Sequence, residues 1–124
     1  MITKFSIDES AATAEFGMSC QRLVPWSTGA EEPPLGVMAC FLPAGNESIQ
    51  DCHDQDEVML VLSGSGEVVI GPDRAGIRTG ELIVIPRNQP HVVINPTTET
   101  LRWVSMYWPL HEPAGQAGTE DASA

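Results

Sequence analysis

The fold is decided by two segments, GNESIQDCHDQDEVMLVLSG at residues 45–64 and GELIVIPRNQPHVVIN at residues 80–95. They hold two histidines and several carboxylates, and the residues 65–79 that join them contain the turn-formers glycine and proline. Histidine nitrogen and carboxylate oxygen together suit borderline divalent ions such as zinc and iron(II). The two segments therefore predict one shared metal site, provided that the fold brings them together.

The alternation of side chains along an extended chain orients the donors of the first segment. Successive side chains in a strand point to opposite faces, so Asp51 and His53 are expected on the same side and Cys52 on the other. This places Cys52 in the core as a packed thiol. Glu57 opens the next strand, and His91 begins a strand of the second segment. If both sets face inward, their donor atoms meet in one cavity.

Short apolar runs separated by glycine and proline continue through the rest of the chain. The spacing of about ten residues, without helical periodicity or an internal repeat, is typical of a sandwich or barrel. The glycine-rich residues 63–66 predict a hairpin between the runs on either side of them. We expect an all-β fold, a small β-barrel of the jelly-roll kind, with strands near residues 22–26, 35–42, 58–62, 67–70, 82–85, 91–94 and 101–108.

A length of 124 residues predicts a single domain. Residues 1–20 give mixed signals and are expected to form an N-terminal extension or an edge strand, and the barrel is expected over residues 21–110. Residues 111–124 change to proline, glycine, alanine, glutamate and serine. Such a composition buries too little apolar surface to become ordered, which predicts a mobile acidic tail.

The composition excludes several classes of function. A net charge of -11 with scattered arginines argues against nucleic acid as a partner, because binding phosphates requires a basic footprint. The only lysine, Lys4, lies at the N-terminus, which argues against Schiff-base chemistry. An odd number of separated cysteines indicates a reducing compartment. With no membrane-length apolar run and no signal-peptide pattern, we expect a cytoplasmic protein that does not bind membranes.

The two segments resemble, in residue types, spacing and short separation, the two motifs of the cupin family. This resemblance covers about half of the chain and implies a cupin-type jelly-roll β-barrel. It also implies three metal ligands, which are His53, Glu57 and His91. Two histidines and one carboxylate on one side of an ion leave coordination positions open for a substrate, as in catalytic sites, so we expect a metal-dependent enzyme that acts on a small polar metabolite. We expect one divalent ion per chain, with zinc favoured and iron(II) or manganese as alternatives.

The chain departs from the family pattern at two positions. Asn88 stands where glycine is usual, and asparagine tolerates the left-handed conformation that a turn requires. Asp51 stands where the first motif usually has another histidine. It is a fourth ligand, a general base, or a residue that orients a ligand from behind. Asp51 and Glu57 are the candidate catalytic residues, and the candidate walls of the substrate pocket are Met38, Cys40, Met59, Asn95, Trp103 and Tyr107.

The flanking residues 22–26, 36–40 and 103–108 resemble the cupin half of hydrazine synthetases. That resemblance implies a zinc enzyme that rearranges an amino-acid-derived small molecule into a product with an N–N bond, with a separate aminoacyl-activating protein as a partner. The alternatives are an iron-dependent cupin dioxygenase, an accessory cupin in polyketide or sugar modification, and a non-catalytic ligand-binding cupin. The apolar runs at residues 35–42 and 101–108 exceed what a small barrel buries, which predicts a homodimer.

Overall fold

The computed structural model describes residues 1–26 and 32–110, and the regular secondary structure of these residues is almost entirely β-strand. They contain one short 3₁₀ turn, η1 (Glu9–Ala11), followed by β1 (Thr13–Glu15), β2 (Met18–Val24), β3 (Gly36–Leu42), β4 (Asp56–Ser63), β5 (Ser65–Ile70), β6 (Asp73–Arg78), β7 (Leu82–Ile85), β8 (His91–Ile94) and β9 (Leu101–Trp108). No helix in this part of the chain is long and apolar enough to span a membrane. The tail expected at residues 111–124 lies outside the described residues.

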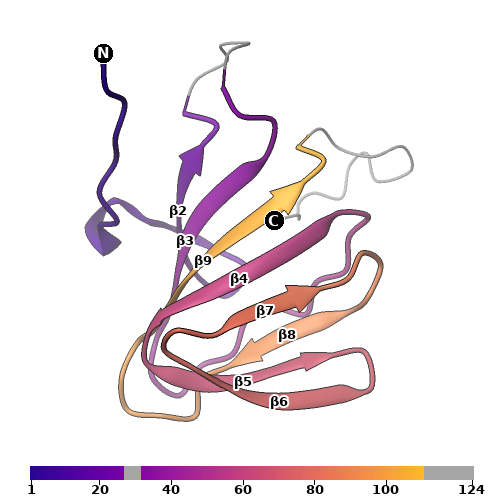
Figure 1. Ribbon diagram of the computed structural model, residues 1–124. Helices are drawn as coiled ribbons and strands as arrows, with labels where there is room; N and C mark the ends of the chain where they lie inside the picture. The colour runs from indigo at the N-terminus through magenta and orange to yellow at the C-terminus, as the bar shows by residue number, and fades with distance from the viewer. Residues whose placement is uncertain (27–31, 111–124) are drawn as a thin grey trace.

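The strands form two antiparallel sheets that pack face to face (Figure 1). The larger sheet has six strands in the order β1-β2-β3-β9-β4-β7, and the smaller one has three in the order β6-β5-β8. The chain therefore passes from one sheet to the other at several places between β4 and β9. This arrangement confirms the expected all-β jelly-roll barrel.

The expectation of a hairpin at residues 63–66 is wrong. β4 pairs with β9 and β7, whereas β5 pairs with β6 and β8, so the two strands belong to different sheets. Gly64 lies at this corner with φ of +90°, and a Cβ there would lie 3.0 Å from the carbonyl oxygen of Thr100. Glycine at this position thus serves a sheet-to-sheet corner, and the hairpin lies one strand later, at Gly71-Pro72 between β5 and β6.

The core lies between the inner faces of the two sheets. β9 shows the pattern most clearly, because Leu101, Trp103, Ser105 and Tyr107 are buried and the residues between them are more exposed. The buried apolar residues form one cluster, made of Cys20, Met38, Cys40, Leu42, Met59, Val61, Val68, Ile77, Ile85, Val93, Leu101, Trp103 and Tyr107. The inward face of β9 is therefore the one available to line a cavity.

The N-terminal residues join the larger sheet. Residues 1–20 contain η1, β1 and the start of β2, and β1 forms an edge of that sheet. β1 and β2 are joined at Phe16-Gly17, where both residues have positive φ, +56° and +79°. This turn packs on the loop between β3 and β4, because the Ile49 amide donates to the Phe16 carbonyl over 2.8 Å. The N-terminal segment therefore lies close to residues 45–64, the first of the two segments that decide the fold, which are called the diagnostic segments below.

Candidate metal centre

The two diagnostic segments are held together along β8. The loop before β4 runs antiparallel to β8, with isolated bridges between Glu47 and Ile94 and between Asp51 and His91. Asp51 and His91 exchange two backbone hydrogen bonds, of 2.9 and 2.8 Å. Because residues opposite each other in such a pair lie close, this bridge places the Asp51 and His91 side chains at one site.

The turn before β8 completes this arrangement. Asn88 has φ of +65°, which confirms the expected left-handed conformation, and its amide donates to the His53 carbonyl over 2.8 Å. Arg87 forms ion pairs with Asp54 and Asp56 over 3.3 and 3.0 Å. These contacts fix the loop that carries His53 against the turn that precedes His91.

The two histidines present their Nε2 atoms to Glu57. His53 Nε2 lies 3.1 Å and His91 Nε2 lies 3.8 Å from Glu57 Oε1, and the two imidazole rings meet edge to face with centroids 5.1 Å apart. His91 Nδ1 lies 3.0 Å from the Gln89 carbonyl oxygen. Because a carbonyl only accepts, Nδ1 of His91 donates there, which leaves its Nε2 as the atom that faces the site.

The cluster is buried, so charged groups in it are poorly solvated. His53 and Glu57 are only 4% and 6% exposed. Burial alone would lower the pKa of His53, but the hydrogen bond and charge of Glu57, helped by Asp51, raise it above its ordinary value. The raised pKa of His53 thus reflects the carboxylate buried beside it.

Asp51 joins the cluster from the loop before β4. Asp51, His53 and His91 each offer one ligand atom, and these atoms all lie within 4.8 Å of one another. Asp51 Oδ1 accepts a hydrogen bond from the Cys52 amide over 2.9 Å, which orients the carboxylate. The side chains of Asp51 and His53 therefore converge as strand alternation predicts, although Asp51 belongs to an isolated bridge rather than to a strand.

The donor set fits a divalent metal ion. Zinc binds histidine nitrogen and carboxylate oxygen at about 2.0–2.2 Å, so ligand atoms around one ion lie roughly 3–4.4 Å apart. The separations of 3.1 and 3.8 Å to Glu57, and the limit of 4.8 Å for the set with Asp51, require only small side-chain adjustments. His53, His91, Glu57 and Asp51 could thus hold one ion.

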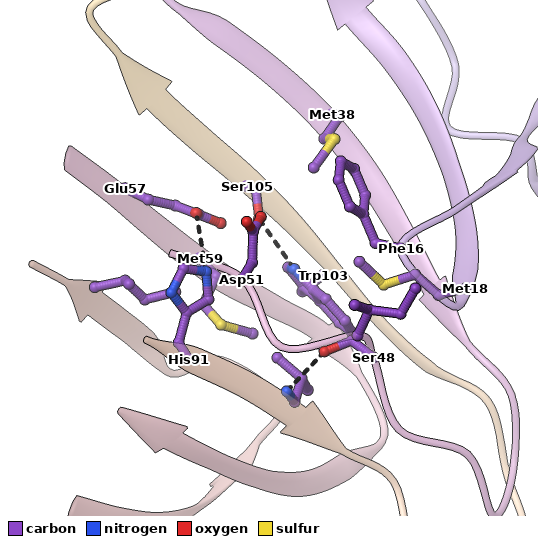
Figure 2. Close-up of a pocket in the computed structure, with 13 residues that line it drawn as sticks. Phe16, Met18, Met38, Ser48, Asp51, Glu57, Met59, His91, Trp103 and Ser105 are labelled. Carbon is purple, nitrogen blue, oxygen red and sulfur yellow. Dashed lines mark hydrogen bonds and ion pairs between the residues drawn. The ribbon is translucent and has the colours of Figure 1, made fainter. Parts of the chain in front are cut away.

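Three members of the cluster, Asp51, Glu57 and His91, line a cavity, whereas His53 is not among its lining residues (Figure 2). The empty space of this cavity is about 400 Å³, counted together with its open mouth. Asp51, Glu57, His91 and Ser105 lie toward one end, and Phe16, Met18 and Met38 lie toward the other. The whole lining consists of Phe16, Met18, Met38, Ser48, Ile49, Asp51, Glu57, Met59, Ile85, His91, Val93, Trp103 and Ser105. The cavity therefore offers a polar end and an apolar wall to a ligand.

Three of the expected pocket residues, Met38, Met59 and Trp103, line this cavity. The other three are buried but are not among its lining residues. The Asn95 amide donates to the carbonyls of Leu42 and Glu99, so this side chain ties loops together. Its role in a pocket stays a prediction.

Cys40 and Tyr107 lie on the inner face of the larger sheet. Burial raises the pKa of the Cys40 thiol well above its ordinary value, which keeps it neutral. Burial also raises the pKa of Tyr107, although Arg22 opposes this by donating a hydrogen bond to its hydroxyl over 3.0 Å. Tyr107 lies opposite Glu57 in the strand register, so it supports the polar end from behind. Contact of either residue with a substrate stays a prediction.

The expectation that Cys52 is a core thiol is wrong, because Cys52 is exposed. The loop pairs with β8 only at isolated bridges, so the residue that points away from the site reaches solvent rather than a second packed layer. The sequence reasoning also missed Phe16, Met18 and Ile49 as cavity residues. Ser105 could have been found from the pattern of β9, since it lies between Trp103 and Tyr107 on the same face.

Comparison with known proteins agrees with this geometry. A family model described as "Cupin domain" matches residues 37–107, more than half of the chain. Two solved structures superpose with a TM-score of 0.78: the plu4264 protein from Photorhabdus luminescens, at 25% identity over 87% of this chain and 88% of that one, and a Cupin 2 conserved barrel domain protein from Salinispora arenicola, at 24% identity over 87% and 89%. The polyketide cyclase RemF from Streptomyces resistomycificus superposes with a TM-score of 0.71, at 19% identity over 90% and 82%.

Proposed function

Because the chain belongs to the cupin family, we propose that it is a metal-dependent cupin enzyme that acts on a small molecule. The observation that carries this proposal is the convergence of His53, His91, Glu57 and Asp51, of which all but His53 line one cavity. Zinc is the favoured ion because of the resemblance to the zinc-dependent hydrazine synthetases, and iron(II) or manganese are alternatives because imidazole and carboxylate donors suit them as well. When bound, a divalent ion in such a set supplies a Lewis acid that polarises an oxygen or nitrogen of the substrate.

The residues of the site have separate tasks in this proposal. His53 and His91 would hold the ion through Nε2, and Glu57, placed between them, would bind it through Oε1. Asp51 lines the cavity and can either complete the ligand set or take a proton from a bound substrate as a general base. Replacing Asp51 with alanine separates the two roles, because loss of a ligand lowers metal content whereas loss of a base lowers turnover alone.

Elemental analysis of the purified protein tests the proposal. We expect about one divalent ion per chain in the wild type and a loss of most of it in His53→Ala and in His91→Ala. The third histidine of the chain provides the matched control, so His111→Ala should retain the wild-type content. Substoichiometric metal that is unaffected by either site substitution would support the rival function, a ligand-binding cupin without catalysis.

We further propose two candidate reactions. The resemblance to hydrazine synthetases favours a zinc-dependent rearrangement that forms an N–N bond, with a separate aminoacyl-activating protein supplying the substrate in the cytoplasm. The apolar lining of the cavity favours cyclisation of a polyketide-like substrate, the activity named for RemF. Genes for an N-hydroxylase and an activating protein beside this one would support the first reaction. Incubation with those proteins that yields no N–N product by mass spectrometry would count against it.

An iron-dependent dioxygenase is the third candidate reaction. The same ligand set also suits iron(II), so the ligand identities alone do not separate it from the first two. Iron as the main metal after purification, together with oxygen uptake in the presence of substrate, would favour the dioxygenase. Zinc as the main metal would exclude it.

We also propose that the protein is a homodimer that pairs through the outer face of β9, β4 and β7. Leu82 and Val84 on the edge strand β7 are 55% and 62% exposed, and Trp108 and Leu62 are exposed beside them. An edge strand with an apolar outer face usually acquires a partner. Sedimentation should show a dimer for the wild type and a monomer for Val84→Glu, while Ala75→Glu, exposed on β6, stays dimeric. A wild-type monomer at micromolar concentration would contradict the proposal.

A further inference from the structure

We propose that the cavity takes an uncharged or cationic ligand with an apolar body and excludes phosphorylated and other multiply anionic compounds. This inference deepens the proposed function, since it assumes that the polar end of the cavity is the reactive end.

Among the residues that the structure describes, those lining the cavity offer carboxylates but no side chain with a fixed positive charge. Asp51 and Glu57 line it, and neither lysine nor arginine does. The arginines are engaged elsewhere, in ion pairs of Arg22 with Glu15, Arg74 with Glu67, Arg78 with Glu81, Arg87 with Asp54 and Arg102 with Glu9. Lys4 lies in the exposed N-terminal segment. An anionic ligand would therefore find no arginine or lysine partner in the cavity.

The charge of a bound ion does not change this conclusion. Two carboxylates balance the two positive charges of a divalent ion, so the loaded site is close to neutral, and the metal-free site is negative. A phosphate group brought into either state would remain an uncompensated buried charge, which is costly. The net charge of -11 on the chain also disfavours the approach of anions. A neutral or cationic ligand meets none of these penalties.

The apolar wall indicates what the rest of the ligand is like. Phe16, Met18 and Met38 lie on the side of the cavity away from the carboxylates and His91 (Figure 2), and Ile49 also lines the cavity. Methionine side chains adapt their shape and contact aromatic rings favourably, so this wall suits a flat or branched apolar body. A ligand that spans the cavity must therefore join a polar reactive group to an apolar part.

The backbone of Phe16 is held in place by contacts with the rest of this wall. Phe16 has φ of +56°, a conformation that costs energy for a residue with a bulky side chain. The Ile49 amide donates to its carbonyl over 2.8 Å, so the turn is anchored to another residue of the same wall. Strain of this kind persists where surrounding contacts enforce it, and it gathers at binding sites. Phe16 is thus placed as a specificity-determining residue.

Binding of four small probes tests the charge preference. Benzyl alcohol, benzylamine, benzoate and phenyl phosphate share one ring and differ in charge, and calorimetry can follow each in the metal-free and in the zinc-loaded protein. We expect phenyl phosphate to bind at least about tenfold more weakly than benzyl alcohol in both forms, and in the metal-free form benzoate to bind more weakly and benzylamine more tightly than benzyl alcohol. Phenyl phosphate binding as tightly as benzyl alcohol would overturn the inference.

Variants of the wall test the apolar preference. Phe16→Ala should lower the affinity for benzyl alcohol by at least about fivefold, since it removes apolar contact area. Phe5→Ala is the matched control, because Phe5 packs on Trp26 and does not line the cavity. Met18→Gln keeps the length of the side chain but makes it polar, and it should also weaken the binding of benzyl alcohol. This second variant keeps the test decisive if Phe16→Ala does not fold. Unchanged affinity in Met18→Gln and in a folded Phe16→Ala would overturn the inference.

The two forms of the protein keep this test separate from that of the proposed function. If the chain binds no metal, the zinc-loaded form gives the same result as the metal-free form, and the order of the four probes still stands or falls by itself. If the chain binds metal but prefers phenyl phosphate, the metal centre stands and the ligand class is wrong.

Discussion

The two ends of the cavity come from different parts of the chain and follow different rules. The polar end is built from the two diagnostic segments, which backbone hydrogen bonds join along β8. The apolar end depends on Phe16 and Met18, which a strained turn of the N-terminal hairpin brings to the cavity. Both ends join segments far apart in the chain, but only the polar end carries metal-binding residue types at a recognisable spacing. This difference suggests that related barrels can keep one chemistry and change the ligand.

The largest expected effect concerns the polar end. Glu57→Gln should lower the affinity for zinc by more than about 100-fold, which exceeds the usual effect of residues that only support a ligand. The reason is that the amide loses the charge that Oε1 presents to both histidines. A competition titration against a chromophoric chelator measures the change. Glu67→Gln, at a surface ion pair with Arg74, should bind zinc like the wild type.

The second prediction concerns the wall behind the polar end. A Cβ at Gly36 would lie 2.1 Å from Cζ of Tyr107, so Gly36→Ala must displace the ring that lies opposite Glu57. We expect the free energy of unfolding to fall by about 2 kcal/mol, as for other overpacked sites. Gly76→Ala is the control, because its Cβ would meet nothing closer than 3.8 Å. Equal urea midpoints for the two variants would show that this wall is not rigid.

The third prediction concerns the apolar end. Phe16→Gly and Phe16→Ala both remove the ring, but only glycine adopts a positive φ without strain. The glycine variant should therefore be more stable than the alanine variant by about 1 kcal/mol. Chemical denaturation of the two proteins under identical conditions measures the difference. An alanine variant that is equally or more stable would mean that the turn is not held in this conformation.

The smallest effect is the pH dependence of the metal-free protein. The pKa of His53 is raised in the folded state. Burial lowers this pKa, but the hydrogen bond and charge of Glu57 raise it by more. The resulting stabilisation is fully present below the ordinary histidine pKa and is lost as the pH rises through the raised value. We expect the free energy of unfolding to fall by less than ~1 kcal/mol between pH 6 and pH 9. Glu57→Gln should flatten this part of the profile, and an unchanged slope would contradict the assignment.

The convergence of Asp51, His53 and His91 could be predicted because these residue types stand at a recognisable spacing in two segments. His91 begins a strand, Glu57 lies near the start of another, and a turn with a left-handed Asn88 joins β7 to β8. Strand positions were also predictable, since alternation and turn residues act over a few positions. The partner of each strand was not predictable in the same way. Gly64 allows a hairpin or a corner, and the choice depends on which sheet receives β5.

The apolar end could not be predicted from the sequence. Nothing in the composition of residues 1–20 shows that Phe16 and Met18 reach the loop before β4, because these apolar residues belong to no motif that would link them to that loop. The exposure of Cys52 has a similar origin. Alternation indicates which way a side chain points but not whether another layer covers it.

Anomalous diffraction at the metal edge from crystals of the metal-loaded protein tests the central claim most directly. The account predicts one strong peak per chain between Nε2 of His53, Nε2 of His91 and Oε1 of Glu57, with the Asp51 carboxylate beside it. The same data would show whether Asp51 binds the ion. No peak at this position, or a peak elsewhere that persists in His91→Ala, would contradict the account.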